Sequence, residues 1–133
     1  MGILIDTSII ITAEKERRNF ANEVQGRDES FFLSVISASE LLHGVHRAQT
    51  PGQMARRSAF VEAILTGFPI LEIDLATARA HAQLWAALAG SGTMIGAHDL
   101  WIGATCLANG LSLATSNIRD FKRVPGLVIE DWR

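Results

Sequence analysis

The sequence has little cysteine, no long apolar run and no excess of one charge, and each absence removes a class of protein. Its one cysteine, Cys106, excludes an internal disulfide and a multi-cysteine zinc site. The apolar helical pattern around Cys106 predicts a buried, unreactive thiol. No stretch has the ~20 apolar residues of a membrane span. A net charge of −2 excludes a coat protein that binds nucleic acid through its overall charge, so such contacts must come from local patches.

What is present is the composition of a compact protein. At 133 residues the chain is expected to form one domain, residues 1–133, and to bury roughly two-thirds of its unfolded surface. Hydrophobic residues make up 48% and charged residues 20%, which is typical of a folded chain rather than a disordered one. The first residues show no basic region followed by an apolar run and a cleavage site, so we expect a cytoplasmic protein.

Short apolar runs alternate with helical patterns along the chain. The apolar runs predict strands over residues 2–6, 31–36, 69–73, 111–115 and 127–129. The helical patterns cover residues 7–16, 19–25, 37–45, 54–65, 75–89, 95–109 and 118–123. The strands are continuously apolar, which favours a parallel sheet covered by helices on both faces. The expected fold is therefore α/β, in three layers, around a central parallel sheet of four to five short strands.

Three details of this pattern make sharper predictions. Thr50-Pro51-Gly52 predicts a turn. The helix over 95–109 is apolar nearly all round, which predicts a central, buried helix. In the helix over 75–89, apolar residues recur at spacings of three and four, so they are expected to face the core. They are Leu75, Ala78, Ala82, Trp85 and Ala89.

Carboxylates stand where apolar runs give way to helices, in segments far apart in the chain. They are Asp6 in ILIDTS, Glu40 in SASELLHG and Asp99 in AHDLWIGA, and the segment LATSNIRDF adds Asn117 and Asp120. In open α/β sheets, ligands bind beyond the carboxyl ends of the strands, near the point where the strand order reverses. A sheet with the first strand in its centre would bring these groups to one edge.

Most of these side chains also have a purely structural interpretation. Asp6 could cap the helix that follows it. Ser37 and Glu40 fit the S-x-x-E capping box, and Asn117 with Asp120 forms a weaker version of that motif. These interpretations predict acids that need not meet.

Asp99 is harder to explain by capping, because it stands in the helix that is otherwise apolar. An ionised carboxylate there would lose hydration at a cost of several kcal/mol unless a cation or a hydrogen-bond donor compensates. Close carboxylates also repel one another and raise their pKa values. Oxygen-only ligands suit Mg²⁺ or Mn²⁺ rather than structural zinc. The sequence therefore predicts a metal site built from acids.

Three segments carry a resemblance to a known family: ILIDTSII, SVISASELLHGVHRA and GAHDLWIGATCLANGLSLATSNIRDFKRVPGLVIEDW. Along its whole length the chain resembles the PIN-domain nucleases of the VapC toxin type. The resemblance implies a PIN-like fold and a Mg²⁺- or Mn²⁺-dependent endoribonuclease. It also implies the toxin component of a type II toxin–antitoxin module, which forms a homodimer and is held inactive by a cognate VapB-type antitoxin.

Carried over by position, Asp6, Glu40 and Asp99 match the family's three acids and would be the metal ligands. Asn117 stands where many PIN domains have Asp, and Asp120 follows one helical turn later, so these two are candidates to complete the catalytic site. The RNA substrate is expected to be single-stranded or looped. Its phosphates would meet local cations, which are Arg47, Arg56, Arg57, Arg119, Lys122 and Arg123.

Other functions stay open at this point. The same fold could serve a non-toxin nuclease or a non-catalytic binding partner. A phosphoryl-receiver domain also gathers acids around Mg²⁺ and would use Asp74 as its acceptor. However, Asp74 is predicted to cap a helix after an edge strand, away from the other acids. His98, next to Asp99, is expected at the surface or beside the metal ligands.

Overall fold

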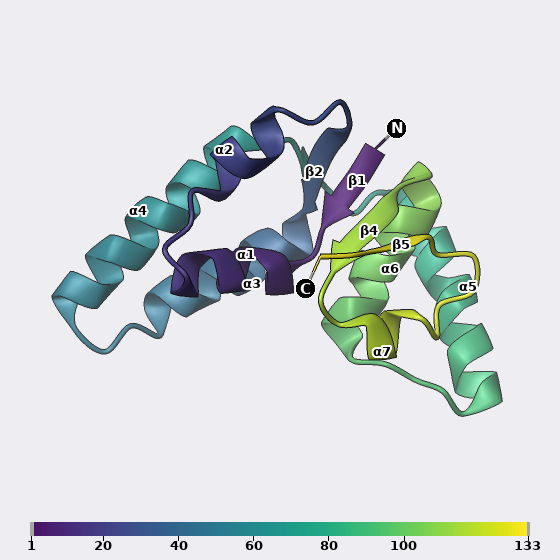
Figure 1. Ribbon diagram of the computed structural model, residues 1–133. Coiled ribbons are helices and arrows are strands. Elements are labelled where there is room, and N and C mark those ends of the chain that lie inside the picture. The colour runs from purple at the N-terminus through teal and green to yellow at the C-terminus, as the bar shows by residue number, and fades with distance from the viewer. Residues whose placement is uncertain (1, 133) are drawn as a thin grey trace.

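The computed structural model describes residues 2–132 and contains a five-stranded parallel sheet in the order β3-β2-β1-β4-β5 (Figure 1). The strands are β1 (Gly2–Ile5), β2 (Ser30–Ser34), β3 (Ile70–Leu71), β4 (Ser112–Thr115) and β5 (Ile129–Asp131). The first strand is central and the third lies at an edge, as the sequence predicted. In the register of the sheet, Ile3 pairs with Phe31 and Leu4 with Leu113. The predicted α/β class is confirmed.

Helices cover both faces of this sheet. They are α1 (Thr7–Lys15), α2 (Phe20–Gln25), α3 (Val35–His46), α4 (Pro51–Gly67), α5 (Leu75–Ser91), α6 (Ala97–Asn109) and α7 (Ile118–Phe121). One core lies between the sheet and the helices α1 to α4, and the other lies under α5 to α7. Since side chains alternate along a strand, Ile3 and Ile5 enter the first core and Leu4 enters the second. None of the helices described is long and apolar enough to cross a membrane.

Several predicted boundaries shift because the sequence patterns did not reveal which residue caps a helix. Ser34 caps α3 by accepting a hydrogen bond from the Ser37 amide at 3.0 Å, so the second strand ends earlier and the helix begins earlier than predicted. The predicted turn at Thr50-Pro51-Gly52 is wrong. Thr50 caps α4, and Pro51 occupies the first helical position, where a missing amide hydrogen costs nothing.

The predicted buried face of α5 is also wrong. Leu75 and Trp85 are 67% and 55% exposed, and the residues that α5 buries are Thr77, His81, Leu84 and Leu88. The His81 ring stacks on Trp101 of α6, with ring centroids 3.5 Å apart. An almost uncharged helix presents two apolar stripes, and periodicity alone does not tell which of them is covered.

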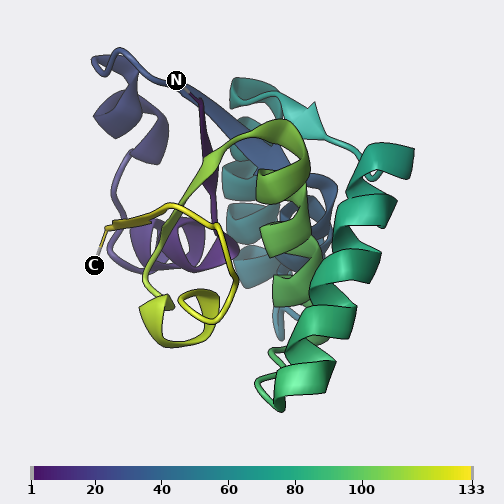
Figure 2. The ribbon, with the colours of Figure 1, turned by 90° about the vertical axis from the view of Figure 1, so that its right-hand side faces the viewer.

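The central helix α6 behaves as predicted. Figure 2 shows it between the sheet and α5. Ile102 and Cys106 are fully buried, and burial raises the pKa of the Cys106 thiol, in agreement with the predicted unreactive cysteine. The helix ends at Gly110, whose φ of 65° is left-handed and favours glycine. This helix therefore holds Asp99 in its first turn, close to the carboxyl ends of β1 and β4.

Candidate active site

Asp6 lies directly after β1 and is only 4% exposed. Its Oδ2 accepts hydrogen bonds from the hydroxyls of Ser8 and Thr115, both at 2.7 Å. Although Asp6 is the residue that precedes α1, its side chain makes no capping bond to that helix, so the capping interpretation is wrong. Burial raises the pKa of Asp6 more than these two hydroxyls lower it. The side chain is therefore fixed in place at an electrostatic cost.

Glu40 lies in the second turn of α3, not in the first as predicted, because Ser34 rather than Ser37 caps this helix. The capping-box interpretation of Glu40 is therefore wrong. The Thr7 hydroxyl donates to Glu40 Oε1 at 2.7 Å. Glu40 Oε2 lies 3.3 Å from Nδ1 of His98, whose side chain is 62% exposed. These contacts tie the carboxylate of α3 to α1 and α6.

Asn117 links the two remaining acids. Its Nδ2 donates to Oδ2 of Asp99 and to Oδ2 of Asp120, both at 3.2 Å. Its side chain makes no capping bond to α7, so capping does not explain this pair either. The backbone amide of Asn117 donates to the Thr115 hydroxyl at 2.9 Å. The Thr115 hydroxyl in turn donates to the Asp6 carboxylate. A chain of neutral groups thus joins the carboxylates of β1, α6 and α7.

The pKa of Asp99 shows that these acids share one neighbourhood. Burial and then the negative charges of Asp6, Glu40 and Asp120 raise it from 3.8 to about 6. Together with the hydrogen bonds through Thr115 and Asn117, this places the remote acids in one neighbourhood at the carboxyl edge of the sheet, while their role as metal ligands stays a prediction. We call Asp6, Glu40, Asp99, Asn117 and Asp120 the acid cluster.

The acid cluster is not a closed metal cage. Within residues 2–132, no three histidine, cysteine, aspartate or glutamate side chains are close enough together to hold one ion as they stand. Hydroxyl and amide groups lie between the carboxylates, as mutual repulsion favours. Mg²⁺ keeps several waters and usually takes only one or two protein carboxylates, so the donor chemistry fits this ion without a preformed cage.

The supporting hydroxyls were only partly predicted. In the sequence, Thr7 and Ser8 begin the predicted helix over 7–16, and Thr115 ends the predicted strand over 111–115. The signal that reveals them is position, since Thr115 ends β4 while Thr7 and Ser8 are the first residues of the helix that follows β1. Asp74 caps α5 as predicted, accepting the Thr77 amide at 2.9 Å. It follows the edge strand, outside the acid cluster, which excludes it as a receiver acceptor beside these acids.

Thr115 offers a direct test of how the acid cluster is supported. It is fully buried, and Thr115→Val keeps its shape but removes the hydroxyl that serves Asp6 and the Asn117 amide. We expect a loss of about 2 kcal/mol in the free energy of unfolding, because two polar groups lose a partner. Urea titration measures it. Thr115→Ser keeps the hydroxyl and should cost only about 1 kcal/mol for the lost methyl group. Equal stability of Thr115→Val and wild type would contradict this role.

Comparisons with known proteins identify the family. The model of the PIN domain family matches residues 3–127. A Rickettsia felis protein named ribonuclease VapC1 is 35% identical over 97% of this chain and 95% of its own length. A Salmonella typhimurium protein named tRNA(fMet)-specific endonuclease VapC is 32% identical, over 99% of this chain and 98% of its own. The crystal structure of DNA-bound VapBC from Salmonella typhimurium has a TM-score of 0.88 at 29% identity and covers 100% of this chain and 99% of that chain. The chain therefore belongs to the PIN-domain family and, within it, to the VapC proteins.

Proposed function

We propose that this protein is a metal-dependent endoribonuclease and the toxin component of a type II toxin–antitoxin module. The observation that carries the proposal is the acid cluster, in which Thr115 and Asn117 join carboxylates from remote segments, and burial together with the charges of these acids raises the pKa of Asp99. Such an arrangement is costly for folding and suits a site that binds a cation. The names of the two relatives, a ribonuclease and a tRNA endonuclease, support RNA as the substrate.

We infer that Asp6, Glu40 and Asp99 hold Mg²⁺ or Mn²⁺. When bound, such an ion stabilises negative charge on a phosphoryl oxygen and makes water a better nucleophile. Asp6 is the most firmly fixed ligand, since Ser8 and Thr115 restrain one of its oxygens. Asp99 is half-buried, and its raised pKa means that a cation competes with a proton for this carboxylate.

Glu40 and Asn117 are also placed to act on the water or the substrate. Glu40 is placed to ligate the ion or to orient the attacking water, because Thr7 restrains Oε1 and Oε2 lies nearer the solvent side with exposed His98. The side-chain amide of Asn117 can donate hydrogen bonds, whereas an aspartate carboxylate at this position could only accept them. Its Nδ2 lies between Asp99 and Asp120, so it could donate to a substrate oxygen when the carboxylates bind a cation.

Two protein partners belong to the proposal. The structures most like this one include complexes named VapBC, and we infer a VapB-type antitoxin as the inhibitor. We also infer a homodimer. The apolar side chains of Leu41 and Val45 on α3 lie in the protein's own core, so they offer no contact surface to a second copy. The exposed Leu75 and Trp85 on α5 are a more accessible apolar surface.

RNA cleavage by the purified protein tests the activity. A cellular RNA pool incubated with Mg²⁺ should give discrete products whose ends can be sequenced, and these should also identify the target. Removing the ion with EDTA should abolish cleavage, and added Mn²⁺ should restore it, because oxygen ligands accept either ion. Cleavage that persists undiminished in EDTA would rule out the metal-dependent mechanism. A protein that cleaves nothing under any of these conditions would favour a non-catalytic PIN protein.

A further inference from the structure

A groove between α1, α3 and α4 leads away from the acid cluster. Its first part is lined by all three helices, and Glu40 of the acid cluster is one of its lining residues. Its second part shares Glu14, Gln53 and Arg57 with the first and continues to Phe60. The two hollows adjoin at these shared side chains beside α4 and together make up the groove. We call it the basic groove.

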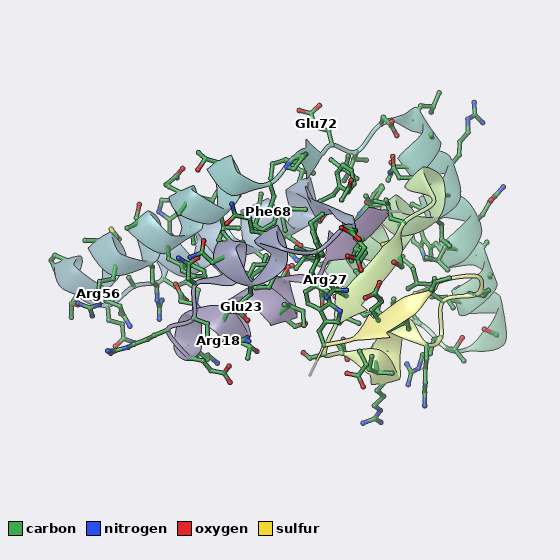
Figure 3. The ribbon with its side chains drawn as sticks, turned by 45° about the horizontal axis from the view of Figure 1, so that its top comes forward. Arg18, Glu23, Arg27, Arg56, Phe68 and Glu72 are labelled. Carbon is green, nitrogen blue, oxygen red and sulfur yellow. The ribbon has the colours of Figure 1, made fainter. Side chains whose placement is uncertain are left out.

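The basic groove concentrates positive charge. Of the chain's 12 lysines and arginines, six line it, and its acids are Glu14 and Glu40. The six are Lys15, Arg17, Arg18, Arg47, Arg56 and Arg57. In Figure 3, Arg18, which follows α1, and Arg56 on α4 both lie in the left half of the view. A protein with a net charge of −2 thus carries half of its cationic side chains on one surface.

Among residues 2–132, Arg18 is the one arginine of the basic groove that forms an ion pair with a carboxylate. Arg57 is half-buried, and its Nη1 donates to the Gly44 carbonyl at 2.9 Å. No ion pair with a carboxylate is formed by Arg47, Arg56 or Arg57 within residues 2–132, whereas Arg18 pairs with two glutamates. A guanidinium has five N–H donors, so Arg57 keeps most of its donors available. Guanidinium groups bind phosphates through paired hydrogen bonds.

We propose that the basic groove holds the backbone of single-stranded RNA on one side of the cleaved bond, with Arg47, Arg56 and Arg57 contacting its phosphates. The inference rests on the proposed function and adds the path of the substrate. Glu40 belongs to both the basic groove and the acid cluster, so a strand lying in the groove brings its next phosphodiester to the acids. A cationic groove that follows the backbone is typical of proteins that bind single strands.

The distribution of charge favours RNA over an acidic peptide as the occupant. The cations extend through both parts of the groove rather than gathering at one end. A polymer with one charge per nucleotide matches this arrangement, whereas a peptide presents a few carboxylates at irregular positions. The direction of the groove, toward the acid cluster, matches a substrate that must reach that cluster.

The test measures binding of a fluorescent single-stranded RNA to the Asp99→Asn protein at several salt concentrations, so that binding is separated from cleavage. Adding Arg47→Gln and Arg57→Gln should weaken binding at least about tenfold at low salt. It should also reduce the slope of log K against log salt by about 1.4, because each contact with a single-strand phosphate contributes about 0.7. Since Arg57 also bonds Gly44, the pair Arg47→Gln and Arg56→Gln, both exposed, makes the same prediction without that bond being lost.

Arg79→Gln is the matched control, because Arg79 is an exposed cation on α5 outside the basic groove, and it should leave the slope unchanged. If wild-type protein cleaves RNA but both arginine pairs keep full RNA affinity and slope, the groove proposal is wrong and the proposed function stands. If RNA affinity is kept but affinity for a glutamate-rich peptide is lost, the groove binds a protein segment and the proposal is again wrong. A wild-type protein without RNA cleavage would instead refute the proposed function, and the groove proposal with it.

Discussion

Asp99→Asn should lower metal-dependent RNA cleavage about a thousandfold or more while leaving the fold intact. The substitution removes a charge from a half-buried side chain that the proposed mechanism uses as a ligand, and a thousandfold corresponds to about 4 kcal/mol of transition-state stabilisation. The fold should survive because an amide oxygen can still accept the hydrogen bond that Asn117 Nδ2 donates to Asp99. Initial cleavage rates of a labelled RNA, compared at saturating Mg²⁺, give the measurement.

Asp74→Asn is the matched control for this experiment. Asp74 also follows a strand and precedes a helix, but its carboxylate caps α5 through the Thr77 amide and hydroxyl. Asparagine caps helices about as well as aspartate, so this variant should cleave RNA at nearly the wild-type rate. Full cleavage by Asp99→Asn, or an equal loss in both variants, would contradict the assignment of Asp99.

A comparison of Asp6 with Asp74 also shows what the sequence alone could establish. Both look like caps, and the reason for separating them was topology: a central strand delivers its terminal residue to the switch point, and an edge strand does not. That argument also assumes that the first strand is central, and the strand order β3-β2-β1-β4-β5 confirms this assumption. The structure adds that Asp6 makes no capping bond to α1 while Asp74 caps α5.

The features that sequence reasoning missed depend on competition between nearly equivalent residues. Ser34 and Ser37 are both good caps, and the helix begins at Val35 because Ser34 takes that role. On α5, the stripe with Leu75 and Trp85 is as apolar as the one with Leu84 and Leu88, and packing against α6 decides between them. Such choices are made by tertiary contacts, which local periodicity does not contain.

The raised pKa of Asp99 makes a second, opposite prediction for stability. A carboxyl group whose pKa rises from 3.8 to about 6 on folding binds its proton more tightly in the native state. Ionisation of Asp99 therefore lowers the free energy of unfolding little below pH 3.8 and increasingly as the pH rises toward 6. Above pH 6 the full loss is present. Without metal, Asp99→Asn should be more stable than wild type at pH 7.5 by at most about 3 kcal/mol, since one unit of pKa is worth about 1.4 kcal/mol.

Urea unfolding in EDTA at pH 7.5 and pH 4.5 measures this difference. We expect the advantage of Asp99→Asn to shrink to about 1 kcal/mol at the lower pH, where the wild-type carboxyl is largely protonated in the native state. Asp74→Asn should show no such gain at pH 7.5, because the Thr77 bonds lower the pKa of Asp74. If the stability advantage of Asp99→Asn over wild type were larger at pH 4.5 than at pH 7.5, the environment described for Asp99 would be wrong.

Added Mg²⁺ should make wild type more stable than Asp99→Asn at pH 7.5, which reverses their order of stability without metal. An ion that binds only the native state stabilises it by mass action, by about 4.1 kcal/mol at a thousand times its dissociation constant, which exceeds the advantage of about 3 kcal/mol that Asp99→Asn has without metal. Wild type should gain this stability at pH 7.5 and Asp99→Asn should gain much less, because one ligand has lost its charge. The repulsion that weakens the metal-free protein and the affinity that makes it an enzyme would then be two results of one arrangement. A gain of equal size in both proteins would mean that Mg²⁺ binds elsewhere.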